Sequence, residues 1–217
     1  MLAPGVLVDP WPIVDAAGAY GGRQWSLDPS TTFTVATLRP GEEKPSLARS
    51  PARGLADCLL PRAAAIHEKG NELLVTCLGR DELVSYDARP GAASARAKRR
   101  WKVASGPTGL AVDETGQRAV VWSQFESSLS LIALGEGAGA PERIAIAPRA
   151  PLDPRLARGR RLFHDVGSSK IAFDGRACAS CHVDGRDDGL SWITRDGPRQ
   201  TPMLLGRLEG TAPYGWL

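Results

Sequence analysis

Two stretches of the sequence, PRAAAIHEKGNELLV (residues 61–75) and PTGLAVDETGQRAVV (residues 107–121), align without a gap at an offset of 46 residues. The match continues into DELVSYD (81–87) and SSLSLIA (127–133). Each unit alternates apolar runs with short turns, in the order strand, turn, strand, turn, strand. The sequence therefore predicts two copies of one antiparallel unit, at 61–87 and 107–133.

A period of this length, with several strands in each unit, is typical of a β-propeller blade. The units resemble the YVTN-type β-propeller repeats of bacterial exported proteins, with LVTCLG (74–79) in the place of that family's YVAN strand. Closing a propeller takes at least about four blades. Residues 1–140 hold two clear units and one further strand-like stretch at 22–38, so we expect an incomplete propeller there.

Composition places the chain among soluble globular proteins. The sequence is 42% hydrophobic and 24% charged, with a formal net charge of +3. Its basic clusters, at 96–102 and 155–161, come without a nucleic-acid motif or interleaved aromatic residues, so we expect no nucleic-acid partner. No stretch approaches the length of a transmembrane helix, so we expect no integral membrane segment in this chain.

A change of composition marks a second domain. Residues 141–152 are rich in proline and predict a linker. Asp153 and Pro154 then suit the N-cap and the first position of a helix. We expect a second domain over 153–217, truncated at its C-terminal side.

The second domain contains CASCH, residues 178–182, and C-x-x-C-H is the attachment signature of a c-type haem. The thiols of Cys178 and Cys181 add to the haem vinyl groups, and His182 is held close enough to the iron to be its proximal ligand. A redox C-x-x-C pair and a structural zinc site are the alternatives. A redox pair needs a βαβ setting. A zinc site needs a fourth ligand and usually a second pair of ligands, and the remaining cysteines, Cys58 and Cys77, stand singly in strand-like stretches.

The order of motifs in this domain is similar to that of the bacterial di-haem cytochrome c peroxidase family. RGRRLFHD (158–165), CASCH and RQTPMLLG (199–206) correspond to that family's GRRLFFD helix, its CASCH and its RNTPTLLN stretch. The resemblance implies a small all-α cytochrome c-like domain with one haem c per chain, attached at Cys178 and Cys181 and ligated by His182. The family's second C-x-x-C-H does not occur in this sequence.

Two residues are candidates for the distal side of the iron. Met203 is the only internal methionine and follows His182 by 21 residues, and a thioether ligand suits electron transfer. The same position also suits an apolar residue at the haem edge. His164 stands where the family has an aromatic residue, and either a packing role or a ligand role fits it.

The sequence thus predicts a mixed fold: incomplete all-β propeller blades followed by a small all-α cytochrome c-like domain. We expect electron transfer with a redox partner protein, the propeller serving as a docking platform. The alternatives are a peroxidase-like di-haem oxidoreductase whose second haem domain lies outside this chain, and a propeller-based binding or sensing protein. Haem c is attached after export, so we expect a periplasmic or otherwise exported protein. Residues 1–15 lack the features of a signal peptide, so we expect the chain to begin inside a longer protein.

Overall fold

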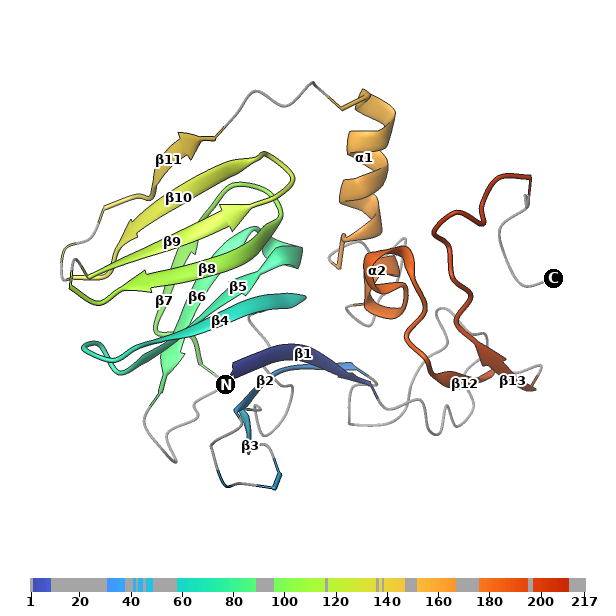
Figure 1. Cartoon of the computed structure of the whole chain (residues 1–217), viewed down its shortest axis with the longest axis horizontal. Helices are drawn as coiled ribbons and strands as arrows, with labels where there is room; N and C mark the ends of the chain where they lie inside the picture. The colour runs from blue at the N-terminus through green and yellow to red at the C-terminus, as the bar shows by residue number, and fades with distance from the viewer. Residues whose placement is uncertain are drawn as a thin grey trace. The chain divides into compact units, whose positions relative to one another are not determined.

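The computed structural model divides the chain into two compact units (Figure 1). The first comprises residues 1–7 and 32–153, and the second comprises residues 8–31 and 154–217. The structure describes residues 2–8, 31–37, 41, 43–44, 46–48, 58–88, 96–115, 117–135, 137, 139–146, 152–166, 176–194 and 197–210.

Three sheets of the structure lie in the N-terminal part of the chain, one of three strands and two antiparallel sheets of four. The three-stranded sheet has the order β1-β2-β3, with β1 Leu2–Val8, β2 Thr31–Thr37 and β3 Ser46–Ala48. Strand β2 falls in the stretch 22–38 that looked strand-like, whereas its expected first strand at 24–27 lies outside the described residues.

The two repeated units form the two four-stranded sheets, and in each sheet the strands follow one another in chain order. A short 3₁₀ helix, Leu78–Arg80, connects the second and third strands of the first sheet. The first sheet contains β4 Pro61–His67, β5 Glu72–Cys77, β6 Glu82–Asp87 and β7 Arg99–Lys102. The second sheet contains β8 Pro107–Asp113, β9 Arg118–Ser123, β10 Ser128–Ala133 and β11 Glu142–Ala145.

The register of the two sheets repeats at the same offset as the sequence. Ile66 pairs with Leu73, and Val112 pairs with Ala119, 46 residues further on in both strands. The first strand of each sheet also carries an irregularity at its start, after Pro61 and after Pro107. A one-residue slip would turn every apolar side chain of a strand to the other face of the sheet. The shared register therefore puts corresponding residues of the two units on corresponding faces of their sheets.

The turns repeat as well, including backbone conformations that L-residues seldom adopt. Left-handed φ values recur at three positions of the unit, each 46 residues from its counterpart. At the first of these positions the second unit has a glycine, whereas the other five residues tolerate the left-handed conformation with a side chain. The pairs are Leu60 (φ 51°) with Gly106 (77°), Asn71 (47°) with Gln117 (47°), and Asp81 (52°) with Ser127 (49°).

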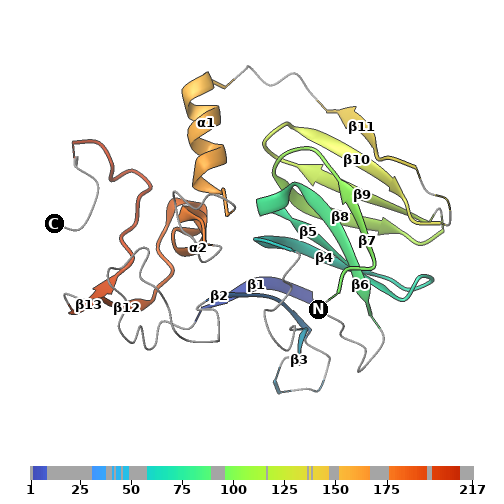
Figure 2. The same ribbon diagram turned by 180° about the vertical axis from the view of Figure 1, so that it is seen from behind.

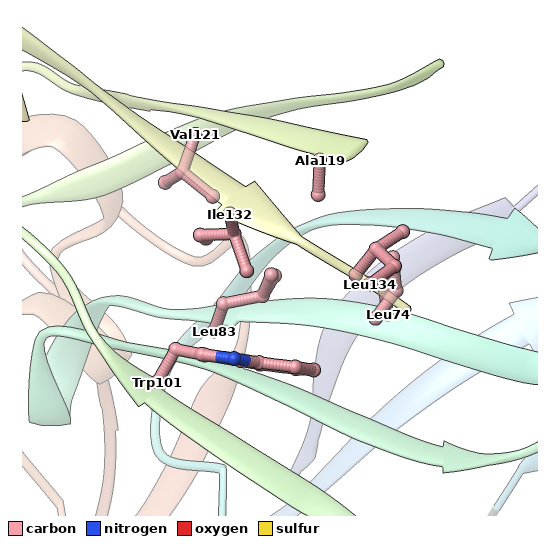
Figure 3. Packing of buried hydrophobic residues seen from close by; sticks show 7 residues of the cluster. All are labelled: Leu74, Leu83, Trp101, Ala119, Val121, Ile132 and Leu134. Atoms are coloured by element: carbon pink, nitrogen blue, oxygen red, sulfur yellow. The ribbon is translucent and has the colours of Figure 1, made fainter. Parts of the chain in front are cut away.

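The two four-stranded sheets pack face to face, and their shared core is shown in Figure 3. The first sheet contributes a face on which Trp101, of its fourth strand, is 8% exposed. Figure 2 shows the same pair of sheets from behind. Burial of these side chains from both sheets supplies the hydrophobic free energy that joins the two repeats. The core consists of Leu74, Leu83, Trp101, Ala119, Val121, Ile132 and Leu134.

A buried carboxylate also stabilises this region. The Glu72 side chain is 4% exposed and accepts hydrogen bonds from both Nε and the terminal nitrogen Nη2 of Arg99 and from the Ser85 hydroxyl. Burial alone would raise the pKa of the Glu72 carboxyl, but the Arg99 hydrogen bonds and charge, together with Lys98 and Ser85, hold that pKa below its ordinary value. Glu72 is therefore charged and paired inside the sheet.

A disulfide joins Cys58 and Cys77, which are both fully buried. Cys77 ends β5, and the backbone beside it is already paired, because the Leu78 N–H donates to the Leu60 carbonyl at 3.1 Å. The bond closes a loop that contains β4, the turn after it and β5. The sequence pattern had suggested no pairing of these two cysteines.

The second unit differs from the expected fold class. Its elements are α1 Pro154–Phe163, α2 Cys178–Cys181, a 3₁₀ turn Val183–Gly185, and an antiparallel hairpin of β12 Ser191–Thr194 with β13 Gly197–Gln200. The prediction of propeller blades followed by a small all-α cytochrome c-like domain is therefore wrong. The described part of 153–217 has only two α-helices, of 10 and 4 residues, and a sheet.

The local sequence explains the difference. Trp192 lies in the first strand of the hairpin, and Gly197 and Pro198 begin the second, so aromatic and turn-forming residues form a hairpin in a domain that was expected to be all-α. Helix α1 itself buries no side chain: Leu156 is 62% exposed and Leu162 is 45% exposed. Helix α1 is therefore not part of a buried all-α core in the described residues.

Strand β11 lies inside 141–152, the stretch for which a linker was expected, and pairs with β10. All four of its residues are exposed. Within the described residues, no helix has the length and the apolar character needed to cross a membrane.

Candidate functional site

Helix α2 is a single turn that carries the C-x-x-C-H motif. Its start is fixed by Ser180, whose hydroxyl accepts a hydrogen bond from the Ala177 N–H at 3.1 Å, the reach-back half of a capping box. Its end is fixed at His182, whose N–H donates to the Cys178 carbonyl at 2.9 Å. The motif residues therefore follow one helical turn, the local conformation that the spacing suggested.

The side chains of the motif differ in exposure. Cys178 is exposed and Cys181 is half-buried, and neither takes part in a disulfide. His182 is buried, with 9% of its surface exposed, and its Nδ1 has no hydrogen-bond partner among the described residues. A buried ring nitrogen without a partner costs free energy, so the imidazole environment is one that a ligand or a further donor or acceptor would complete.

The loop after His182 turns sharply. Asp184 and Gly185 both have left-handed φ values, 52° and 77°. The Gly185 carbonyl accepts hydrogen bonds from two successive N–H groups, those of Leu204 at 2.9 Å and Leu205 at 2.8 Å. The segment that contains Met203, a half-buried residue, is thus bonded to the loop that directly follows the motif.

Trp192 is the buried centre of this region, with 7% of its surface exposed. Its indole Nε1–H donates to the Asp188 carboxylate at 3.0 Å and to the Thr201 hydroxyl at 3.1 Å. The guanidinium carbon of Arg176 lies 5.6 Å from the centre of the indole ring, within range of a cation–π interaction. Arg176, from before the motif, and Asp188 and Thr201, from two segments after it, therefore all contact this one side chain.

His164 lies just after α1. Its Nδ1 is 2.8 Å from the Arg160 carbonyl, and because a carbonyl only accepts, this nitrogen carries the proton. The hydrogen-bond network therefore assigns the lone pair of the neutral ring to Nε2. The His164 ring also makes an edge contact with Phe163, with 5.2 Å between the ring centres.

The donor set suits a covalently attached haem. Two thiols outside any disulfide lie three residues apart on one turn, and the next residue is a buried imidazole with an unsatisfied nitrogen. The zinc alternative loses two of its ligands, because Cys58 and Cys77 are bonded to each other. Within the described part of the chain, no three His, Cys, Asp or Glu side chains are grouped so as to hold a metal ion by themselves.

Sequence reasoning missed the pairing of Trp192 with Asp188 and Thr201. In the sequence, Trp192 is an aromatic residue close to the motif, and a packing role for it does not name a partner for the indole N–H. The signal that was available is general: a buried tryptophan needs an acceptor, and an aspartate four residues before it is a short-range candidate. Trp216, the other tryptophan that follows the motif, lies outside the described residues.

Comparison with known proteins gives no family assignment. No protein-family model matches the chain. No curated protein matches its sequence.

Proposed function

We propose that this protein carries one covalently bound haem c and transfers electrons. Cys178 and Cys181 are the attachment points, and His182 is the proximal ligand of the iron. When bound, the haem supplies one-electron exchange between ferric and ferrous iron. The protein residues hold the group, orient the imidazole and limit the access of water.

The observation that carries this proposal is the arrangement of the motif on helix α2. Cys178 is exposed, Cys181 is half-buried and neither is in a disulfide, whereas His182 is buried and keeps an unsatisfied ring nitrogen. A thioredoxin-like pair would instead have its thiols at the start of a longer helix after a β-strand. Here α2 has four residues, and the described segment before it, 176–177, is irregular.

The proposal includes an exported protein with a protein redox partner. The Cys58–Cys77 disulfide supports export, because buried structural disulfides are typical of oxidising compartments. The two repeated sheets, packed on one core, support a rigid platform on which a partner can dock. The expectation of no nucleic-acid partner belongs to the same proposal.

The test is covalent attachment. The chain, coexpressed with a haem-maturation system and exported, is expected to retain its haem through acid-acetone extraction and to give haem-stained bands on a denaturing gel. A Cys178→Ala/Cys181→Ala variant provides the matched negative, because it keeps His182. A Cys58→Ala/Cys77→Ala variant removes the same number of sulfurs and is expected to keep the haem, provided that it folds.

Release of the haem from the parent protein on extraction would refute the proposal. So would equal retention by the Cys178→Ala/Cys181→Ala variant. Mass spectrometry of the loaded chain gives an independent measurement, since a thioether-bound haem adds its mass to the peptide that contains residues 178–182.

A further inference from the structure

Trp192 makes more polar contact than a packing residue requires. Its single indole N–H is shared between Asp188 and Thr201, at 3.0 and 3.1 Å, and the side chain is 7% exposed. Thr201 is itself 8% exposed. The Trp192–Thr201 pair is therefore shielded from water. Loss of the indole N–H removes this bond from the buried Thr201 hydroxyl, whereas loss of that hydroxyl leaves the indole N–H bonded to Asp188 alone.

The partners of Trp192 lie close in sequence to the residues of the proposed haem site. Asp188 follows His182 by six residues, and Thr201 precedes Met203 by two. Arg176, over the indole ring, precedes Cys178 by two. After Met203, the N–H groups of Leu204 and Leu205 donate to the Gly185 carbonyl. Before Met203, Thr201 is connected to Asp188 through the indole of Trp192. The segment is therefore attached to the residues after His182 on both sides of Met203.

We infer that Trp192 is a positioning residue for the axial ligation of the haem: through Asp188 and Thr201 it fixes the segment of Met203 relative to His182. This inference rests on the proposed function. Ligand geometry at a metal has to be held to within about 0.5 Å by the surrounding residues, and outer hydrogen bonds of this kind tune the metal as well. Thioether ligation raises the potential of a haem, so a loosened Met203 lowers it.

A purely space-filling Trp192 makes a different prediction. The Trp192→Phe substitution keeps an aromatic ring in the core and removes the N–H donor. If the ring volume alone matters, Thr201→Val, which keeps the shape of the threonine and removes its hydroxyl, changes stability slightly and leaves the haem spectrum alone. If the hydrogen bonds position Met203, both variants change the iron ligation in the same direction.

The experiment uses the haem-loaded full chain and measures the ferric spin state by absorbance and the reduction potential by redox titration. We expect Trp192→Phe and Thr201→Val to convert part of the low-spin population to high spin and to lower the potential. Met203→Ala is expected to do the same to a greater extent. Thr201→Ser, which restores a hydroxyl acceptor, is expected to restore the parent values. Trp101→Phe in the first sheet is the matched control and is expected to leave both quantities unchanged.

The double variant Trp192→Phe/Met203→Ala decides whether the effect passes through Met203. We expect it to match Met203→Ala alone, because a residue that acts by positioning Met203 has nothing to position once the thioether is gone. An additive fall in potential would refute the inference. Unchanged spectra in Trp192→Phe and Thr201→Val, or in Met203→Ala, with the haem still covalently bound, would refute it while the proposed function stands. Loss of the haem from the parent protein on extraction would refute both.

Discussion

Removal of the Cys58–Cys77 disulfide should destabilise the first sheet by an amount that follows from the length of the loop it closes. The two cysteines are 19 residues apart in sequence and fully buried. In the chain-entropy model, a loop of this length loses about 11 cal/mol/K in the unfolded state, or about 3 kcal/mol at 25 °C. The Cys58→Ala/Cys77→Ala variant should therefore unfold with about 3 kcal/mol less free energy than the parent.

The assay is equilibrium unfolding in urea, followed by tryptophan fluorescence, since Trp101 lies in the core of this sheet pair. Cys178→Ala/Cys181→Ala is the matched control, because it removes two cysteines that form no disulfide. We expect the midpoint of its transition to stay at the parent value when the haem-free proteins are compared. Reduction of the parent protein should reproduce the loss seen in the Cys58→Ala/Cys77→Ala variant.

A loss below about 1 kcal/mol would show that the entropy argument fails for this loop, because the model requires several times that value. A thiol titration checks the premise separately. The haem-free parent, denatured without a reductant, should react with two equivalents of thiol reagent and, after reduction, with four, since the sequence has four cysteines. Four reactive thiols before reduction would exclude the disulfide itself.

Three further predictions test the pair of four-stranded sheets and the proposed haem site. Gly106→Ala should lower the free energy of unfolding by about 1–3 kcal/mol, because Gly106 has a φ of +77° and an added Cβ would lie 2.4 Å from Cγ of Phe125. Gly137→Ala is the control: Gly137 has a φ of +73° but open space around it, so the loss in the same urea assay should be smaller. Glu72→Gln should lower stability at pH 7 by about 1.5–3 kcal/mol, the range for hydrogen bonds to charged groups. The folded-state pKa of Glu72 is lowered, so its stabilising contribution is full above its unfolded pKa and is lost as the pH falls through the folded value. The parent and Glu72→Gln stabilities should therefore converge below about pH 4, and a gap of constant size down to pH 2 would contradict this assignment. In the loaded protein, Met203→Ala should give a high-spin ferric spectrum, and an unchanged spectrum would return Met203 to a packing role.

The repeated strands could be predicted from the sequence because several local signals agreed there. Alternating apolar residues, turn residues and the 46-residue offset all indicated the same three strands in each unit. The fourth strands were not predicted. Arg99–Lys102 is mostly charged, and Glu142–Ala145 is fully exposed, so neither shows the pattern of a half-buried strand. These strands also start 43 residues apart rather than 46, which takes them out of the gap-free alignment.

The wrong prediction for the second unit came from treating a resemblance in motif order as a resemblance in fold. The motif itself requires one helical turn, and α2 provides that turn in four residues. The remaining elements depend on the residues between the motifs, and there Asp184, Gly185 and Gly189 favour turns, with left-handed backbone at all three. Trp192 then enters a strand whose partner begins at Gly197.

Neither the disulfide of the first unit nor the long-range hydrogen bond of the candidate site could be predicted from spacing. A disulfide between Cys58 and Cys77 requires that the end of β5 lies beside the segment before β4, which follows only from the hairpin register. The bond from Trp192 to Thr201 likewise crosses the β12–β13 hairpin, near the pair Ser191 and Gln200. Sequence patterns identify the groups that need partners, and the topology decides which partners they meet.

The two pairs of cysteines have different chemistry because of that topology. Cys58 and Cys77 lie with their Cα atoms 5.0 Å apart inside the first unit, where a disulfide is compatible with the backbone and shielded from reductants. Cys178 and Cys181 share one helical turn, on which Cys178 is exposed and Cys181 is half-buried, and neither is in a disulfide. Export is compatible with both pairs: the oxidising compartment forms the buried disulfide, and a thiol reductant of the haem-maturation system keeps Cys178 and Cys181 as the thiols that add to the haem vinyl groups. The disulfide in one unit therefore supports the cofactor proposed for the other.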